Sequence, residues 1–194
     1  MKDYLQASEY IDIHHPLIQE KAKDLALNVQ GDEAIAKRCF EFVRDEIKHS
    51  WDYQLNPVTC KASQVLLHGT GYCYAKSHLL AALLRANDIP AALCYQRLTI
   101  SDNQPPFCLH GLNAIHLKNY GWYKVDARGN KAGINAQFMP PLEQLAFKLQ
   151  SKGELDINDN YSHPLPEVIQ ALTQHATFME VANNLPDLPS HLTE

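Results

Sequence analysis

Apolar residues recur every three or four positions through the first quarter of the chain, with polar residues between them. This spacing predicts two amphipathic helices, one over residues 16–31 and one over residues 32–48. A third predicted helix, over residues 73–87, carries apolar side chains on more than one face, which is typical of a helix buried in a core. Residues 50–70 are mixed in character and predict a long loop that leads to a short helix at 62–67.

The middle of the chain changes to the pattern of strands. Residues 92–100, 107–117 and 121–126 are rich in apolar and aromatic side chains, and residues 101–106 and 118–121 carry turn signals. A buried helix that leads into hairpin-connected strands predicts an α+β fold, with the helix packed on an antiparallel sheet of three to five strands.

The last third of the chain predicts mostly connections and helices. We expect a loop over residues 128–141, a short helix over 141–150 and a polar surface connection over 151–162. Residues 164–183 predict a further helix, whose apolar stripe could pack on the core or form a dimer contact. No internal repeat interrupts the chain, so we expect one domain over residues 1–194, with a core at about 32–130 and helical extensions at both ends.

A cysteine stands at the predicted start of the buried helix. A thiol at a helix N-terminus faces unpaired backbone N–H groups and the positive end of the helix dipole, both of which favour the thiolate. Cys73 is therefore a candidate nucleophile. The alternative is a structural thiol, because cysteine in an apolar segment is most often a small core residue.

Two further residues decide between these interpretations. His110 and Asp126 lie on neighbouring predicted strands, and their separation in sequence fits adjacent strands of a hairpin. A thiol, an imidazole that deprotonates it and a carboxylate that fixes the imidazole tautomer are the three parts of nucleophilic acyl transfer. The three residues together favour a catalytic Cys73.

The order and spacing of these segments resemble a known family. From residue 34 to residue 126 the chain is similar to the transglutaminase-like superfamily of papain-type thiol enzymes, and residues 127–131 resemble its small stand-alone bacterial members. The resemblance rests on His110 and on residues 40–45 (FEFVRD), 65–73 (VLLHGTGYC), 81–91 (AALLRANDIPA) and 121–126 (GWYKVD).

The resemblance implies a role for each of the three residues. It makes Cys73 the nucleophile, His110 the general base and later acid, and Asp126 the residue that orients the histidine. Family members often carry an aromatic residue two positions after the histidine, where this chain has Leu112, so the substrate groove is not inferred from the family. Nothing in the chain supports the calcium control of the large animal enzymes.

The chemistry predicted from these residues is attack of the thiolate on an amide carbon, which yields a thioester that water or an amine then cleaves. The products are those of hydrolysis, deamidation or amine transfer. The backbone N–H of Cys73 is the expected first oxyanion donor, and Trp51 or Gln54 is the weaker candidate for the second. The alternatives are a non-catalytic peptide- or protein-binding module and an acyl-CoA-dependent N-acyltransferase.

Other chemistry-bearing side chains have simpler interpretations. His116 shares the strand of His110 and competes with it as the base, but a surface imidazole is the favoured interpretation. His14 and His15 precede a proline with no carboxylate or cysteine at ligand spacing, so we predict neither a metal nor any other cofactor. The remaining thiols are expected to be inert.

Composition limits the class of partner. The 17 lysines and arginines are dispersed and the formal net charge is −5, which argues against nucleic acid. The chain shows no apolar run of membrane-spanning length and no signal-peptide pattern, so we expect a soluble cytoplasmic protein without a membrane partner. Five widely spaced cysteines, an odd number, favour reduced thiols. The expected substrate is a peptide or protein amide.

Overall fold

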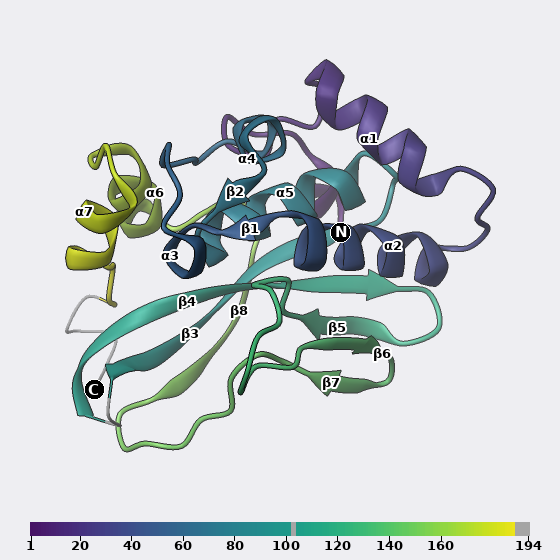
Figure 1. Ribbon diagram of the computed structural model, residues 1–194. Coiled ribbons are helices and arrows are strands. Elements are labelled where there is room, and N and C mark those ends of the chain that lie inside the picture. Colours follow the sequence, from purple (N-terminus) through teal and green to yellow (C-terminus); the bar gives the residue numbers. More distant parts are fainter. Residues whose placement is uncertain (102–103, 189–194) are drawn as a thin grey trace.

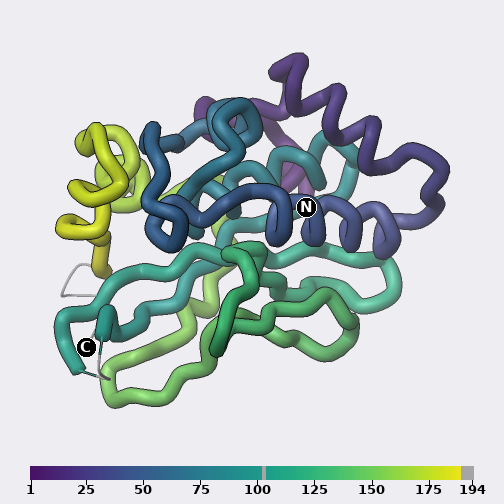
Figure 2. The backbone as a smooth tube through the Cα atoms, viewed as in Figure 1, coloured from purple at the N-terminus to yellow at the C-terminus, as the bar shows by residue number. Residues whose placement is uncertain are grey.

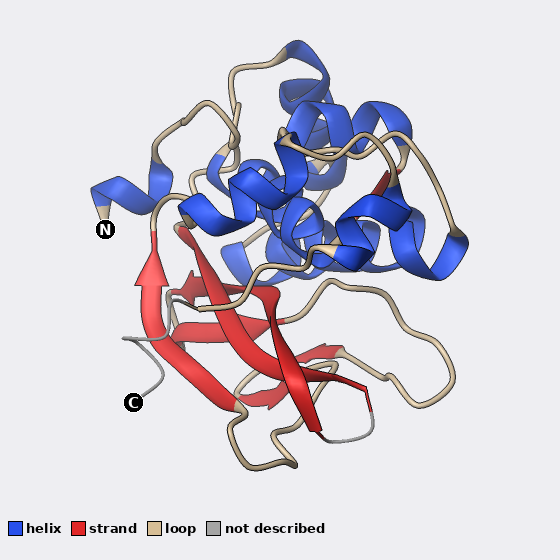
Figure 3. Ribbon diagram, turned by 90° about the vertical axis from the view of Figure 1, so that its left-hand side faces the viewer, coloured by secondary structure: helices blue, strands red, loops and turns tan. Residues whose placement is uncertain are grey.

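A layer of helices packs on one face of a curved sheet (Figure 1, Figure 3). The computed structural model describes residues 1–101 and 104–188. Its helices are the 3₁₀ helix η1 (Lys2–Leu5) and α1 (Pro16–Ala26), α2 (Asp32–Glu46), α3 (Ser50–Tyr53), α4 (Ala62–His68), α5 (Cys73–Arg85), α6 (Pro166–Thr173) and α7 (Phe178–Asn183).

Among the described residues, the main sheet has four antiparallel strands in the order β5-β4-β3-β8. The long hairpin β3–β4 forms its centre, as the sequence predicts, and β5 covers the other edge of β4 along Asn113 to Leu117. The strands are β1 (Lys48–His49), β2 (Thr70–Gly71), β3 (Ala91–Ser101), β4 (Gln104–Leu117), β5 (Gly121–Val125), β6 (Gln137–Met139), β7 (Leu142–Gln144) and β8 (Leu155–Tyr161).

Helix α5 is the centre of the core. All of its residues are buried, and it packs against α1, α2 and α4 on one side and β3 and β4 on the other. Arg85 at its end is 2% exposed and donates hydrogen bonds to the carbonyl oxygens of Gln6, Ala91 and Ser162. The predicted α+β fold, with a buried cysteine-bearing helix on an antiparallel sheet, is confirmed.

The first helix is shorter than its hydrophobic pattern suggests. α1 ends at Ala26, and Gly31 is the N-cap of α2 with φ 89°, rather than the end of α1. Glycine adopts this positive φ without a steric penalty, so the turn between the two helices forms there.

The helix predicted over residues 141–150 is wrong. The chain instead forms β7, which pairs with β6 in the stretch predicted as a loop over residues 128–141, and residues 145–150 are irregular. Leu142 is 64% exposed, so a helix here would have little apolar face to bury. The hairpin is held from outside: the Tyr123 hydroxyl donates to the Leu142 carbonyl, and the Lys124 N–H donates to Glu143 Oε1.

The polar connection predicted over residues 151–162 is also wrong. Residues Leu155–Tyr161 form β8, which pairs with β3 at the edge of the sheet. The strand contains Asp156 and Asp159, and charged side chains are common on edge strands, where they discourage pairing with other chains. Because most of its residues are polar, the segment lacks the apolar pattern by which a strand is predicted from sequence.

The helix predicted over residues 164–183 divides into α6 and α7. Thr177 and Glu180 form a capping box that starts α7, because each side chain satisfies a backbone N–H of the other residue. Of the predicted apolar stripe, Val168 and Leu172 are buried in this chain's own core, whereas Met179 is 45% exposed. None of the helices in the described residues has the length and apolarity to cross a membrane.

Candidate active site

Cys73 is the first residue of α5, and only Tyr72 separates it from the short strand β2. The preceding residue, Tyr72, is extended and acts as the N-cap, so the chain turns into the helix at the thiol. The first N–H groups of a helix lack intrahelical partners, and the N-terminus favours negative charge. The Cys73 side chain therefore lies at the electropositive end of α5, and the residue is 7% exposed.

Gly111 allows β4 to approach this first turn closely. A Cβ at Gly111 would lie 3.0 Å from Tyr74 Cα and 3.1 Å from Tyr74 N, closer than packed atoms normally come. Without a side chain, the strand comes near enough for the Gly111 N–H to point at Cys73 Sγ, with N and S 3.4 Å apart. Backbone of both α5 and β4 thus surrounds the sulfur.

The structure brings His110 and Asp126 together beside Cys73. His110 lies on β4 next to Gly111, and Asp126 follows the last residue of β5. His110 Nε2 and Asp126 Oδ2 are 2.7 Å apart, and the two side chains are 6% and 0% exposed. Because Asp126 occupies Nε2, Nδ1 is the ring nitrogen left for the thiol.

The electrostatics of the pair favour its charged form. Burial opposes protonation of His110, but the charge of Asp126, the nearby Cys73 and hydrogen bonds to both raise the pKa of His110 to about 10. Burial likewise opposes ionisation of Asp126, yet the charge and hydrogen bond of His110 keep its pKa below the usual value. The arrangement holds an imidazolium next to a sulfur at neutral pH.

Backbone and side-chain contacts fix Asp126 in turn. Its Oδ1 accepts the Arg128 N–H at 3.1 Å, and its Oδ2 accepts the Ala146 N–H at 3.2 Å. The Arg128 guanidinium points the other way and forms two hydrogen bonds to Asp52, of 2.7 and 3.1 Å. Asp126 is therefore oriented by three groups besides bulk packing: two backbone donors and the imidazole.

Phe147 is a site residue that the sequence did not reveal. Its ring packs edge-on against His110, with centroids 4.9 Å apart and planes at 87°. It belongs to the irregular segment after β7, in the region where a helix was expected. The sequence offers no pattern that marks Phe147, whose place beside His110 follows from the contact of the neighbouring Ala146 N–H with Asp126.

Next to the triad is a polar cavity of about 290 Å³. His49 on its wall is buried beside Gly71, because β1 and β2 pair in parallel, and its ring packs on Tyr72. Burial, with the charge of Arg128, lowers the pKa of His49 well below its ordinary value, so this imidazole is neutral. The cavity is lined by Arg44, Asp45, Ile47, Lys48, His49, Asp52, Tyr53, Arg128, Gly129, Asn130 and Lys131.

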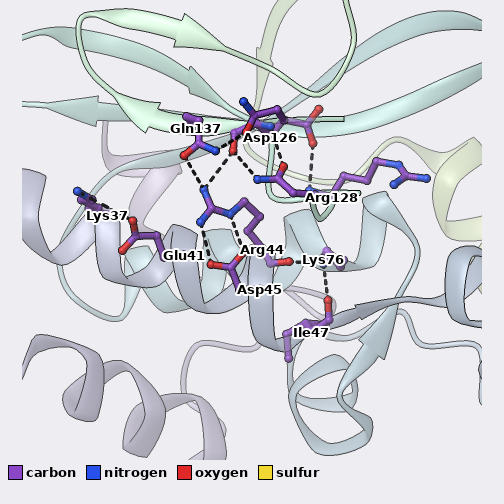
Figure 4. A network of polar contacts seen from close by, with 12 residues as sticks. Lys37, Glu41, Arg44, Asp45, Ile47, Lys76, Asp126, Arg128 and Gln137 are labelled. Carbon is purple, nitrogen blue, oxygen red and sulfur yellow. Dashed lines mark hydrogen bonds and ion pairs between the residues drawn. The ribbon is translucent and has the colours of Figure 1, made fainter. Parts of the chain in front are cut away.

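A polar network lies on the helix side of Asp126 and Arg128 (Figure 4). Lys76 of α5 is 1% exposed and donates to the Ile47 carbonyl at 2.5 Å, which satisfies a carbonyl at the end of α2. Burial, assisted by Arg128, lowers the pKa of Lys76 to about 7. Arg44 joins the same network through its ion pair with Asp45 and a hydrogen bond to Gln137. These contacts join α5 to the end of α2, and α2 to β6.

The two candidates for the second oxyanion donor lie on or after α3. Trp51 is 46% exposed and packs against Phe178 of α7, with ring centroids 6.2 Å apart. Gln54 ends α3 in the left-handed conformation and is exposed. That Trp51 or Gln54 supplies the second donor to the oxyanion stays a prediction.

The remaining candidates lie elsewhere. His116 packs on Trp122 and contributes no bond to Asp126, and His15 caps α1 by accepting the Leu17 N–H through Nδ1. In the described residues, no group of three or more His, Cys, Asp or Glu side chains is arranged to hold a metal ion. All five cysteines are free, and burial raises the pKa of Cys39, Cys60, Cys94 and Cys108 to about 12.

Comparisons with known proteins bear on the fold and on the family. The chain is similar to the crystal structure of a candidate cysteine protease from Cytophaga hutchinsonii, with 21% identity over 64% of this chain and 40% of that one, and a TM-score of 0.51. The periplasmic domain of TgpA from Pseudomonas aeruginosa matches with 19% identity over 64% of this chain and 45% of that one, and a TM-score of 0.47. The chain thus spans less than half the length of either protein. No curated protein matches it.

The first of these likenesses shows a shared fold. The family assignment rests on a family model, which matches residues 19–127 and therefore more than half of the chain. The matched region contains α5, β3, β4 and β5, and with them Cys73, His110 and Asp126. The chain belongs to the transglutaminase-like superfamily.

Proposed function

We propose that this protein is a cysteine-dependent enzyme that cleaves or transfers amide bonds through a thioester on Cys73. The observation that carries the proposal is the pairing of His110 with Asp126 at 2.7 Å beside a cysteine at a helix N-terminus. Burying an imidazole and a carboxylate costs desolvation free energy, which a pair of side chains needed only for packing would avoid. The family membership supports the same chemistry.

The reaction begins from an ion pair in which the proton of the Cys73 thiol already lies on His110, in line with the raised pKa of His110. The thiolate attacks the carbonyl carbon of an amide, and the C=O electron pair moves onto oxygen to form a tetrahedral oxyanion. As the carbonyl re-forms, the C–N bond breaks and the amine leaves with the proton from the imidazolium. Water, deprotonated by His110, then attacks the thioester, which releases the acid and restores the thiol.

Backbone geometry supports stabilisation of the oxyanion. The Cys73 N–H at the start of α5 supplies one donor, and Trp51 or Gln54 is proposed as the second. One preorganised donor contributes roughly 3 to 4 kcal/mol to the transition state. We favour water over an amine as the acceptor, because an acceptor amine needs a site that excludes water and binds it.

The proposed substrate is a peptide or protein amide, handled by one domain over residues 1–194. A non-catalytic binding module is the second candidate, and the 7% exposure of Cys73 favours it, because a closed site admits no substrate. An acyl-CoA-dependent N-acyltransferase is the third candidate, which turnover of acyl-CoA without amide cleavage would identify.

The test is alkylation of each cysteine by iodoacetamide as a function of pH, followed by mass spectrometry. We expect Cys73 alone to react quickly below pH 7, and His110→Ala to remove that reactivity. The other four thiols are internal controls, since burial raises their pKa to about 12. Cys108 is the sharpest control, because it is more exposed than Cys73.

His116→Ala is the matched variant, as it removes an imidazole from the same strand without touching Asp126. If Cys73 reacts no faster than Cys108, or if His110→Ala and His116→Ala behave alike, the enzyme proposal is wrong. A positive result is followed by turnover assays on a panel of peptide amides and acyl-CoA thioesters.

A further inference from the structure

The candidate triad is closed in this structure. Cys73, His110 and Asp126 are 7%, 5% and 0% exposed, whereas a peptide substrate must place an amide carbon against the Cys73 sulfur. Some segment next to the site must therefore move for a peptide to enter. Residues 178–188, at the end of the described chain, contact Tyr72 and Leu109, the neighbours of Cys73 and His110. We name this segment the C-terminal strap.

The first part of the strap, α7, is attached around Tyr72, the residue before Cys73. The Tyr72 hydroxyl donates to the Phe178 carbonyl at 2.6 Å, and the Phe178 N–H donates to Asn56 Oδ1 at 2.8 Å. The Phe178 ring packs on Trp51. Figure 1 shows α7 beside α3, on the side of the helical layer that meets the curved end of β4.

The second part of the strap lies along an edge of β4. In the described chain, β5 pairs with this edge of β4 from Asn113 onward, and the first turn of α5 packs against it at Gly111, so the strap meets the edge at Leu109, before both. Here the Leu109 N–H donates to the Pro186 carbonyl at 2.7 Å, and the Leu109 carbonyl accepts the Tyr74 hydroxyl. Figure 2 shows the chain descending from the C-terminal helices toward this end of the sheet.

The bond to Pro186 is made very close to the reacting groups. Leu109 directly precedes His110, and on the same edge the Gly111 N–H points at Cys73 Sγ. Two residues along a strand span about 7 Å. The strap thus accepts a hydrogen bond from the Leu109 N–H, in the residue next to His110. This donor lies about 7 Å from the Gly111 N–H, which faces the Cys73 sulfur.

A charged contact holds the strap to the same strand pair. Arg97 on β3 donates to both carboxylate oxygens of Asp187, at 2.7 and 2.6 Å. Its guanidinium also stacks on Phe107 of β4, 3.9 Å from the ring centroid, which fixes its direction. Pro186 between these groups is buried, and Leu185 and Leu188 pack against the core.

We propose that the edge of β4 at Leu109, with which no strand of the described chain pairs, is a docking surface for an extended peptide and that the C-terminal strap occupies it as an intramolecular competitor of substrate. The proposal rests on the proposed function, since it names how a peptide reaches Cys73. The strap shows which features the surface accepts: a backbone carbonyl opposite the Leu109 N–H, followed by an acidic side chain opposite Arg97.

Physical reasoning explains why few contacts suffice. Adding an extended segment to an open strand edge gives affinity through main-chain hydrogen bonds and specificity through side-chain contacts. A segment of the same chain is present at a high effective concentration, so even a weak contact keeps the edge filled. A peptide with the same pattern displaces the strap when its own concentration and affinity together outweigh the effective concentration and affinity of the strap.

The first experiment weakens the strap at its charged contact. In Asp187→Ala we expect alkylation of Cys73 by a bulky maleimide to rise about fivefold, as expected for loss of one ion pair, while Asp187→Glu behaves like the wild type. Asp24→Ala is the matched control, because it removes an exposed ion pair with Lys21 far from the site. Amide exchange measured by NMR gives an independent readout: the Leu109 N–H loses protection, and the Ile115 N–H, within the β4–β5 pairing, keeps it.

The second experiment refills the edge with a probe peptide. We expect acetyl-Asn-Leu-Pro-Asp-Leu-amide, which copies residues 184–188, to restore Leu109 protection and slow maleimide labelling in Asp187→Ala. The same peptide with Lys in place of Asp should have no effect, because it places a cation against Arg97.

Failure of this proposal and failure of the proposed function give different results. If Leu109 protection is unchanged in Asp187→Ala, or the acidic peptide does not restore it, the docking proposal is overturned whether or not Cys73 is catalytic. If His110→Ala leaves Cys73 reactivity unchanged, the proposed function fails, and the exchange of Leu109 still reports on the strap.

Discussion

The first turn of α5 carries Cys73, and the C-terminal strap contacts Tyr72 and Leu109, but the two regions are held in different ways. The helix turn is buried on every side, and Gly111 brings a strand against its backbone. The strap buries only Val181 and Pro186 fully and is otherwise held by partly exposed apolar contacts, hydrogen bonds and an ion pair, with Met179 and Glu180 exposed. Densely packed elements hold reacting groups in fixed positions, whereas sparsely held segments open at low cost.

This contrast separates positioning from access. Changes in the packed centre should alter the chemistry of Cys73, and changes in the strap should alter how readily reagents reach it. The predictions that follow test this separation, from the largest expected effect to the smallest.

Removal of the nucleophile should have the largest effect. In Cys73→Ser we expect amide turnover to fall by at least about 10⁴-fold, because a hydroxyl is a far weaker nucleophile at neutral pH. The melting temperature should change little, since the two side chains are similar in size. Turnover assays and thermal unfolding measure the two effects, and Cys108→Ser is the control. Retention of activity in Cys73→Ser would assign the chemistry to another residue.

Asp126→Asn should cause the second-largest loss of amide turnover. The amide can hold the ring through the same position, but it stabilises the wrong tautomer and no longer the imidazolium, so turnover should drop by about 10³- to 10⁴-fold. The pH profile of Cys73 alkylation should move toward that of an ordinary thiol. Asp45→Asn, which affects the ion pair with Arg44, is the control. Equal losses in both variants would make Asp126 merely structural.

Gly111→Ala tests the close approach of β4 to α5. The new Cβ would meet Tyr74 backbone at 3.0 Å, so we expect a loss of about 1 to 3 kcal/mol in the free energy of unfolding and slower alkylation of Cys73. Gly133→Ala is the control, because it introduces strain at φ 81° with no atom within 4 Å. It should lower stability without changing the thiol's reactivity. Urea unfolding and alkylation kinetics distinguish the two outcomes.

The His110–Asp126 pair should make stability depend on pH. The pKa of His110 is raised from 6.5 to about 10 in the folded state, so its stabilising contribution is complete below pH 6.5 and is lost as pH rises through about 10. The free-energy difference between wild type and His110→Ala, measured by urea unfolding, should therefore shrink from pH 6 to pH 10.5. A constant difference over this range would show that the pair is not charged in the folded protein.

The smallest effect is expected at the start of the strap helix. Thr177→Ala removes the cap of α7 and should cost about 1 kcal/mol locally, with faster amide exchange in α7. Cys73 should become somewhat more accessible to a bulky maleimide but no less nucleophilic toward iodoacetamide. Thr173→Ala at the end of α6 is the control. A loss of iodoacetamide reactivity would mean that the strap also positions the site.

Much of the centre of this protein was determined by local sequence. The apolar run after Cys73 predicts a buried helix, and the hairpin spacing of His110 and Asp126 predicts adjacent strands. These predictions work because helix burial and hairpin register depend on residues that are near one another in the chain. The family resemblance then associated the three residues with one chemistry.

Only the tertiary structure decided what surrounds that centre. The polar strand β8 forms because β3 offers it an edge, Phe147 meets His110 from a segment without regular structure, and Pro186 reaches Leu109 from the far end of the chain. Each contact joins residues that are distant in sequence, so no local pattern of hydrophobicity encodes it. The sequence by itself determined which groups could react, and the long-range packing decided how they are oriented and covered.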